Sequence, residues 1–205
     1  RRWAELAGKD ALVGEDTFGG EDPQIASQIT RIKSLAKQPD FIVICSFPPG
    51  GVSATRQLRA AGINQPLLGS ESWDGDFWLE GVPNLSDFFL VTYGSVFGND
   101  PRPAVADFMK KFGAKWNHAP VTSHAITGYS VIEAWTRAVE RAGTFDTDKV
   151  RDELQKFKDE PLLAGPTTFT ETDHINMQRD LLLIEVKDGK HGNVVQVVRA
   201  EKMPQ

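Results

Sequence analysis

Residues 41–45 have the sequence FIVIC, an unbroken apolar run that is rich in β-branched side chains. Such a run is typical of a strand that is covered on both faces, as in a parallel sheet with helices above and below it. The turn sequence SFPPGG follows, and the apolar spacing after it predicts a helix over residues 52–61. The segment therefore indicates one β-α unit of a parallel sheet.

The segments on either side continue this alternation of strands and helices. The predicted elements are strands at residues 10–14, 66–69 and 88–93, an amphipathic helix at 23–37 and a short helix at 75–81. Asp22 and Pro23 supply an N-cap and a first helical residue for the amphipathic helix. This order predicts a doubly wound α/β layer.

The second half of the chain changes character, because three helical segments follow one another without a strand between them. They are residues 101–116, residues 122–142 and a helix capped by Asp146 or Thr147. Each has a broad apolar face that needs a sheet to cover it. We therefore expect that an N-terminal sheet, which would complete this lobe, lies outside the chain.

The C-terminal part is rich in predicted strands. They lie at residues 167–170, 181–186 and 194–198. The Asp-Gly step between the last two is a hairpin signal. The connecting loop, residues 187–193, is expected to be longer than a two-residue turn.

The composition is that of an ordinary globular protein. Among the 205 residues, 40% are hydrophobic and 25% are charged, and the formal net charge is −5. A negative charge argues against a nucleic-acid or anionic membrane surface, and no apolar run approaches the ~20 residues of a membrane-spanning helix. The single cysteine, Cys45, cannot form an internal disulfide, and we expect it to pack as a small hydrophobic side chain.

The sequence lacks the motifs of common catalytic and cofactor-binding sites. It contains no GxGxxG, GxxxxGKS/T or GxSxG, and its four histidines have no zinc-ligand spacing. The acidic loop at residues 15–22 does not match an EF-hand. The sequence therefore predicts a binding protein rather than an enzyme, with no cofactor and no metal site.

Ligands of open α/β sheets bind beyond the carboxyl ends of the strands, and this rule selects three segments, two of them loops before residue 75 and the third residues 93–97. Ser46, Phe47 and Pro48 follow the FIVIC run. Ser46 can form one hydrogen bond to a ligand, and Phe47 either faces a ligand or packs under the next helix. Glu71 and Trp73 follow the strand PLLG. Glu71 is either a ligand carboxylate or a solvated acid, and Trp73 contacts either a ligand or the core.

Two further candidates lie later in the chain. Tyr93 ends the strand predicted at 88–93 and belongs to a hinge, a core or a cleft. His124, near the start of the long helix, faces either a cleft or solvent. Asp74 is expected to cap the short helix rather than to bind a ligand.

In their order, these segments resemble the type I periplasmic substrate-binding proteins of ABC importers, and among them the leucine, isoleucine and valine binding proteins. The similarity rests on DFIVICSF, LRAAGI, PLLGSESW, AITGYSVIEAWTRAVERAG and GPTTFTETDHINMQRDLLLIEVKDG. It implies the C-terminal two-thirds of a periplasmic binding protein-like I fold, which has two doubly wound, Rossmann-like lobes. Residues 1–93 and 184–205 would form the second lobe, and residues 94–183 the helical part of the first lobe, whose N-terminal sheet is absent.

The resemblance also implies a function. A periplasmic or otherwise extracytoplasmic protein of this kind captures an amino-acid-like solute between its lobes by hinge closure and passes it to a membrane permease. Glu71 matches the acidic residue that pairs with the α-ammonium group of an amino acid, and Phe47 matches an aromatic wall. Many members have a tyrosine or another polar aromatic residue at the position of Phe47, which leaves room for an aromatic acid, an amide or an apolar solute.

Two alternatives remain open at this point. One is a ligand-sensing receptor or regulatory domain of the same fold, which would bind an amide or an aromatic acid. The other concerns what covers the apolar helix faces and completes the fold. Either the missing N-terminal part of the first lobe or a second copy of the chain would do so.

Overall fold

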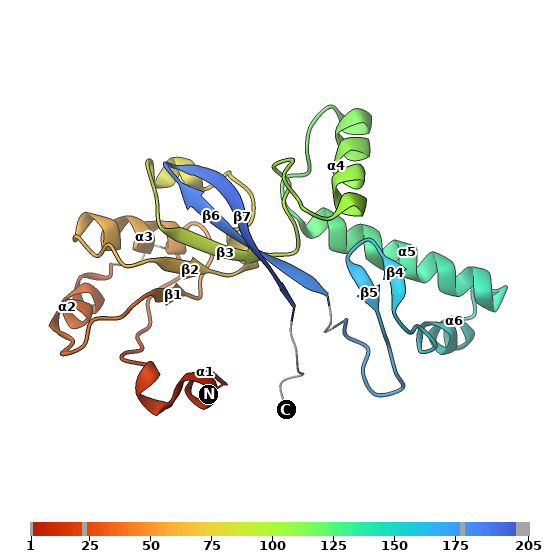
Figure 1. Cartoon of the computed structure of the whole chain (residues 1–205), viewed down its shortest axis with the longest axis horizontal. Helices are drawn as coiled ribbons and strands as arrows, with labels where there is room; N and C mark the ends of the chain where they lie inside the picture. The colour runs from red at the N-terminus through yellow and green to blue at the C-terminus, as the bar shows by residue number, and fades with distance from the viewer. Residues whose placement is uncertain (1, 22–23, 177–178, 200–205) are drawn as a thin grey trace. The chain divides into compact units, whose positions relative to one another are not determined.

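The computed structural model describes residues 2–21, 24–176 and 179–199 (Figure 1). The chain divides into two compact units. Unit 1 comprises the chain up to Val91 together with Ile184–Asn193, and unit 2 comprises Thr92–Leu183 together with the strand residues that follow Asn193. These last strand residues were expected in the same lobe as the first part of the chain. The correspondence of the two units to two lobes of a longer protein stays a prediction.

A five-stranded sheet has the strand order β1-β2-β3-β6-β7. Its strands are β1 (Ile42–Ile44), β2 (Leu67–Gly69), β3 (Phe88–Thr92), β6 (Asp180–Lys187) and β7 (Lys190–Arg199). β1 pairs with β2, and β2 with β3, in parallel. An α-helix at residues 50–60 joins β1 to β2, and two 3₁₀ turns lie between β2 and β3, so the predicted α/β class is confirmed.

The helical elements of unit 1 depart from the prediction at two points. They are α1 (Arg2–Ala7), the 3₁₀ turn η1 (Lys9–Ala11), α2 (Ala26–Ser34), α3 (Gly50–Ala60) and the 3₁₀ turns η2 (Glu71–Trp73) and η3 (Leu79–Gly81). The strand predicted at 10–14 is wrong, since Leu12 is exposed and pairs with no described strand. Of the helix predicted at 75–81, only η3 forms, and Gly75 at the expected start has a positive φ of 88° that is not helical.

α2 is shorter than the predicted helix over 23–37. Leu35 has an extended backbone, which ends the helix. Gln38 Nε2 donates to the carbonyl oxygen of Leu35 at 3.2 Å, so a side chain satisfies a carbonyl group at this helix end. The capping role predicted for Asp22 and Pro23 lies outside the described residues.

Strand β1 is covered on one face only, which corrects the expectation that both faces are covered. Ile44 is buried, whereas Val43 is 53% exposed and the adjacent Cys45 is exposed as well. β1 lies at one edge of the sheet, and an apolar run alone does not show whether helices reach both sides of an edge strand. Cys45 is therefore not the buried small side chain that was expected.

β6 and β7 form a hairpin whose connection is shorter than predicted. Lys187 ends β6 and Lys190 begins β7, so the turn consists of Asp188 and Gly189 alone. Both residues have positive φ, 50° and 69°, as a type I′ turn requires, and Asp-Gly is a preferred pair for it. The Ser86 hydroxyl accepts a hydrogen bond from the Asp188 N–H at 2.9 Å and holds the turn in place.

Unit 2 is built mainly on helices. Its elements are α4 (Pro103–Trp116), α5 (His124–Ala142), α6 (Thr147–Leu154) and a small antiparallel sheet of β4 (Glu160–Leu162) and β5 (Gly165–Thr167). Figure 1 shows α6 and the small sheet beside α5. Asp146 is the predicted cap of α6, and its carboxylate accepts the Lys149 N–H at 3.1 Å. The strand predicted at 167–170 ends at Thr167 instead, because it pairs with β4.

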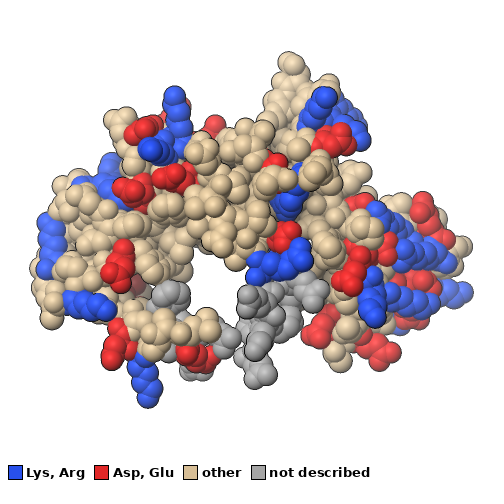
Figure 2. Space-filling view, viewed as in Figure 1, with Lys and Arg blue, Asp and Glu red and all other residues tan. Residues whose placement is uncertain are grey.

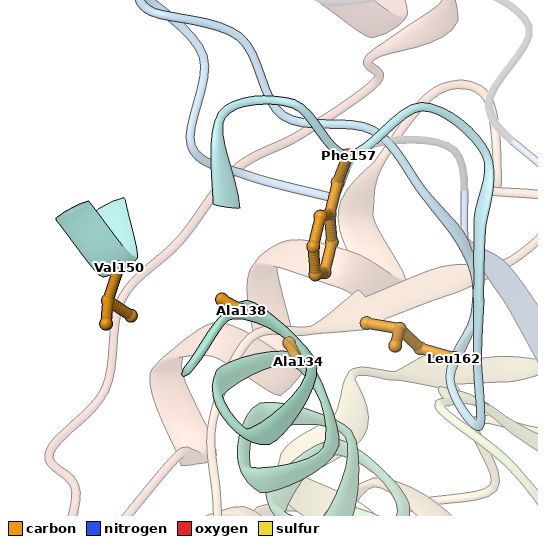
Figure 3. Close-up of a cluster of buried hydrophobic side chains, with 5 residues drawn as sticks. All are labelled: Ala134, Ala138, Val150, Phe157 and Leu162. Atoms are coloured by element: carbon orange, nitrogen blue, oxygen red, sulfur yellow. The ribbon is translucent and has the colours of Figure 1, made fainter. Parts of the chain in front are cut away.

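Two apolar clusters form the core of unit 2. The first, drawn in Figure 3, consists of Ala134, Ala138, Val150, Phe157 and Leu162. Its alanines on α5 leave room for the Phe157 ring and for α6 to approach the helix. In the second cluster, Val105 and Met109 of α4 pack with Ile126 of α5. α4 is therefore covered within the unit, which corrects the expectation that all three helices lack cover.

One face of α5 nevertheless remains uncovered in this chain. Tyr129, Val131, Ile132 and Trp135 are all exposed, and they recur at helical spacing. Exposed apolar surfaces on one helix face are typical of interaction sites. The expectation of an uncovered apolar helix face is confirmed for α5.

Charged side chains of both signs gather over α5 and α6 (Figure 2). Arg137 pairs with Glu133 and with Glu160, and Arg141 also pairs with Glu160. The hydrogen bond from Arg137 lowers the pKa of Glu160 below its ordinary value, so this carboxylate stays ionised. The charges on this surface thus compensate one another locally. Across the part of the chain that the structure describes, no helix is long and apolar enough to cross a membrane.

Candidate functional site

The loops after β1 and β2 are joined at the carboxyl ends of these parallel strands. Ser72 Oγ donates to the carbonyl oxygen of Ser46 at 3.0 Å, and the hydroxyl oxygens of Ser70 and Ser72 lie 2.8 Å apart. The two loops selected from the sequence are therefore in direct contact. Glu71 lies within the second loop, between the two serines.

Phe47 and Glu71 are the exposed functional groups of these two loops. Phe47 is 61% exposed, so it does not pack under α3, and Pro48 beside it is half-buried. Glu71 is exposed and forms no ion pair with any residue of the described chain. An aromatic ring and an unpaired carboxylate in neighbouring loops can bind an apolar group and a cation.

Of the two roles left open for Trp73, the structure shows packing in the core. It is 0% exposed, and its ring centroid lies 4.9 Å from the centroids of both Trp78 and Phe88. Cβ atoms at Gly51 and Gly69 would lie 2.5 and 2.6 Å from this ring, so only glycines leave it enough room. Trp73 therefore has no exposed surface that a solute could contact. Its packing holds the turn that carries Glu71.

The Gly75 turn that follows is held by two side chains, one of which sequence reasoning missed. The buried Asp74 accepts the Gly75 N–H at 2.9 Å, so it is not the helix cap that was expected. From the distant β7, His191 Nε2 donates to the Gly75 carbonyl oxygen at 2.7 Å, and its ring meets Trp78 edge-on. Burial lowers the pKa of His191 below its ordinary value. A lone histidine in a hairpin gives no sequence signal for this contact.

Acidification from pH about 7 to about 5 is expected to destabilise unit 1 through His191. The unfolded chain binds the His191 proton near the ordinary pKa of 6.5, whereas the folded chain binds it only at lower pH. Stability therefore falls as the pH drops below about 6.5 and stops falling below the folded-state pKa. Urea unfolding followed by circular dichroism across this range measures the effect.

The control for this prediction is His191→Gln, whose side-chain amide can still donate to the Gly75 carbonyl but does not titrate. The variant should lose the part of the pH dependence that belongs to His191. Equal slopes of stability against pH in the variant and the native chain would contradict the prediction.

A second set of candidate residues lies in unit 2, directly after β3. The Tyr93 ring meets the His124 imidazole edge-on, with 5.3 Å between their centroids. Two residues that were predicted separately are thus in contact. The Arg179 guanidinium lies over the same Tyr93 ring, 4.3 Å from its centroid, in a cation–π contact. Arg179 was missed because an isolated arginine, far from Tyr93 in sequence, carries no motif.

The backbone of Tyr93 is firmly held. Arg102 Nη2 donates to the Tyr93 carbonyl oxygen at 2.7 Å, and Arg102 is itself paired with the buried Asp100 at 2.8 Å. The preceding Thr92 shares a hydrogen bond of 2.7 Å with Ser123, and both residues are fully buried. The aromatic ring under Arg179 is therefore presented by a rigid strand end.

A groove of about 450 Å³ runs along α5 within unit 2. Apolar side chains such as Ala134, Leu154 and Phe169 line it, and Arg179 is among its polar residues. Its size is that of a small-molecule pocket. The groove also includes Trp135, which lies on the exposed face of α5.

The polar groups in both sets are suited to binding rather than to holding a metal. Within residues 2–21, 24–176 and 179–199, no three His, Cys, Asp or Glu side chains are grouped so that they could ligate an ion. What the two sets offer is an aromatic ring, hydroxyl groups and single charges, which suit hydrogen bonding and charge pairing with a small molecule.

Comparison with known proteins identifies the family. A family model described as periplasmic binding protein matches residues 1–191, which is nearly the whole chain. The chain belongs to the periplasmic binding protein family. The resemblance inferred from the order of segments is confirmed, and the family is one of binding proteins rather than enzymes.

Relatives of this periplasmic binding protein include proteins named for branched-chain amino acids. The leucine-, isoleucine-, valine-, threonine- and alanine-binding protein of Pseudomonas aeruginosa is 24% identical over 155 residues, which are 76% of this chain and 40% of that protein. The solved leucine binding protein of Thermotoga maritima superposes with a TM-score of 0.74 at 21% identity, over 95% of this chain and 55% of that chain.

A third relative is a solute binding protein from R. palustris, solved in complex with benzoate. It has a TM-score of 0.65 at 22% identity and covers 96% of this chain and 54% of that chain. The structural matches show that this periplasmic binding protein has the predicted type I fold. It spans about half the length of the relatives that it matches.

Proposed function

We propose that this chain carries one lobe and part of the other lobe of an extracytoplasmic solute-binding protein that serves an ABC importer. The observation that supports the proposal best is the exposed pair Phe47 and Glu71 in joined loops at the carboxyl ends of β1 and β2. The protein would capture an amino-acid-like solute by hinge closure of its lobes and pass it unchanged to a membrane permease.

The ligands named for the relatives are consistent with a small organic acid that has an apolar part. One relative is named for leucine, isoleucine, valine, threonine and alanine, and another was solved with benzoate. Phe47 offers an apolar surface to either kind of solute, whereas Glu71 favours a solute that also carries an ammonium group. An amino acid with an apolar side chain satisfies both residues, so we favour it over a simple aromatic acid.

The uncovered face of α5 supports the proposal that the fold is completed by further polypeptide. Val131, Ile132 and Trp135 are exposed in this chain, and the relatives are about twice as long. The remaining part of the first lobe is the occupant that we propose for this face. A second copy of the chain is the other candidate.

Glu71→Gln is expected to weaken the binding of leucine by roughly 10- to 100-fold, because a charge-assisted bond to the ammonium group becomes a neutral one. Isothermal titration calorimetry on the longest version of the chain that its gene encodes measures the change. Leucinamide, which keeps the ammonium group, should lose affinity to the same extent.

The matched control is Glu80→Gln, which removes another exposed carboxylate from unit 1. It should leave the affinity for leucine unchanged. Native protein that binds neither leucine nor any other amino acid would refute the proposed solute class. Equal affinities of Glu71→Gln and native protein would remove Glu71 from the site.

A further inference from the structure

We propose that Arg179, which lies over the Tyr93 ring that His124 also contacts, is a carboxylate-binding subsite of unit 2. The inference deepens the proposed function and rests on it, because it assigns the acid group of the solute to a residue that no sequence motif indicates. It also restricts the solute to organic acids, whether or not they carry an ammonium group.

The first argument is the pairing of the arginines in unit 2. Five of them form an ion pair: Arg102 with Asp100, Arg137 with Glu133 and Glu160, Arg141 with Glu160, Arg151 with Asp148 and Asp152, and Arg199 with Asp180. Arg179 is half-buried and has no carboxylate partner among the described residues. A partly desolvated guanidinium group favours an anion more strongly than a fully solvated one.

The second argument is that Arg179 is held in position. Its guanidinium carbon lies 4.3 Å from the centroid of the Tyr93 ring. Contact with an aromatic face leaves the N–H groups at the edge of the guanidinium group able to donate, and two of them match the two oxygens of a carboxylate. Because Arg102 fixes the Tyr93 backbone, little conformational freedom is lost when an anion binds.

The third argument is the chemistry of the neighbours. The ring of the exposed His124 lies roughly perpendicular to the Tyr93 ring, so a second side chain that can form hydrogen bonds contacts the same ring as Arg179. Neither Arg179 nor His124 forms an ion pair with an Asp or Glu of the described chain, and the neighbouring Asp180 is paired with Arg199. The cluster therefore presents donors and positive charge to an approaching solute.

A titration with acetate tests the subsite directly and does not depend on the identity of the solute. The side-chain Nε–H resonance of Arg179, assigned by its loss in Arg179→Lys, is followed by NMR while sodium acetate replaces sodium chloride at constant ionic strength. A saturable shift is expected. The absence of a shift, or a shift that does not saturate, would overturn the proposal. A separate titration with sodium chloride that gives an equal shift would overturn it as well.

Binding of acid and amide pairs then connects the subsite with the solute. Native protein is expected to bind leucine and phenylacetate roughly 10- to 100-fold more tightly than leucinamide and phenylacetamide, and Arg179→Gln should abolish this preference. Arg179→Lys keeps the positive charge but loses the paired N–H donors of the guanidinium group, so it should retain part of the preference for acids. The matched control is Lys115→Gln, which removes another cation over an aromatic ring of unit 2.

The two experiments separate the possible failures. Saturable acetate binding without measurable binding of leucine, phenylacetate or their amides would contradict the proposed function but support the subsite. Tight leucine binding that Arg179→Gln leaves unchanged would support the proposed function but overturn the subsite. An equal loss of affinity in Arg179→Gln and Lys115→Gln would also overturn the subsite, since the loss would then come from the lower net positive charge of unit 2 and not from the position of Arg179.

Discussion

Asp100→Ala is expected to lower the free energy of unfolding by about 3–5 kcal/mol, because it leaves Arg102 partly buried without its partner. The Asp100 side chain is 1% exposed. Its carboxylate accepts the Ser95 N–H at 2.9 Å and the Nε–H and Nη2–H groups of Arg102 at 2.9 and 2.8 Å. Since Arg102 also donates to the Tyr93 carbonyl oxygen, the variant should loosen Tyr93 as well.

Urea unfolding followed by circular dichroism measures this loss. Asp107→Ala is the matched control, because its ion pair with Lys111 is exposed and should contribute little. Asp100→Asn retains an acceptor for the N–H groups but not the charge, so its stability should lie between those of Asp100→Ala and the native chain. A loss no larger than that of Asp107→Ala would show that the buried pair does not stabilise unit 2.

Trp73→Ala is expected to cost about 3–5 kcal/mol of stability, since it removes a fully buried indole ring from the core of unit 1. Trp78 and Phe88 both contact this ring, and they would border the cavity that the substitution leaves. Trp73 also lies two residues from Glu71, so the loss of its ring should disturb the loop that presents this carboxylate.

Chemical unfolding followed by far-UV circular dichroism tests this prediction without using tryptophan fluorescence, which the substitution itself changes. Phe47→Ala is the control, because Phe47 is exposed and its loss should change stability by less than about 0.5 kcal/mol. Trp73→Phe should restore part of the stability and keep the solute affinity of the native chain. A Trp73→Ala variant that is as stable as the native chain but binds the solute more weakly would instead indicate that Trp73 contacts the solute.

The sequence alone was sufficient for the fold class and for one half of the candidate site. Short apolar runs such as residues 41–45 alternate with helical segments, and this order specifies a parallel sheet because parallel strands need a long crossover between them. The rule that ligands bind at the carboxyl ends of strands then selected Phe47 and Glu71, and both are exposed in the structure. These inferences needed only local pattern and order.

Only the tertiary structure decided which side chains are buried and which distant residues meet. Trp73 is buried because Gly51 and Gly69 leave room for its ring, and Cys45 is exposed because its strand lies at an edge. The contact of Arg179 with Tyr93 joins segments that are far apart in sequence. Local periodicity determines which face of a helix or strand is apolar, but burial and such contacts depend on how segments pack, which no local pattern encodes.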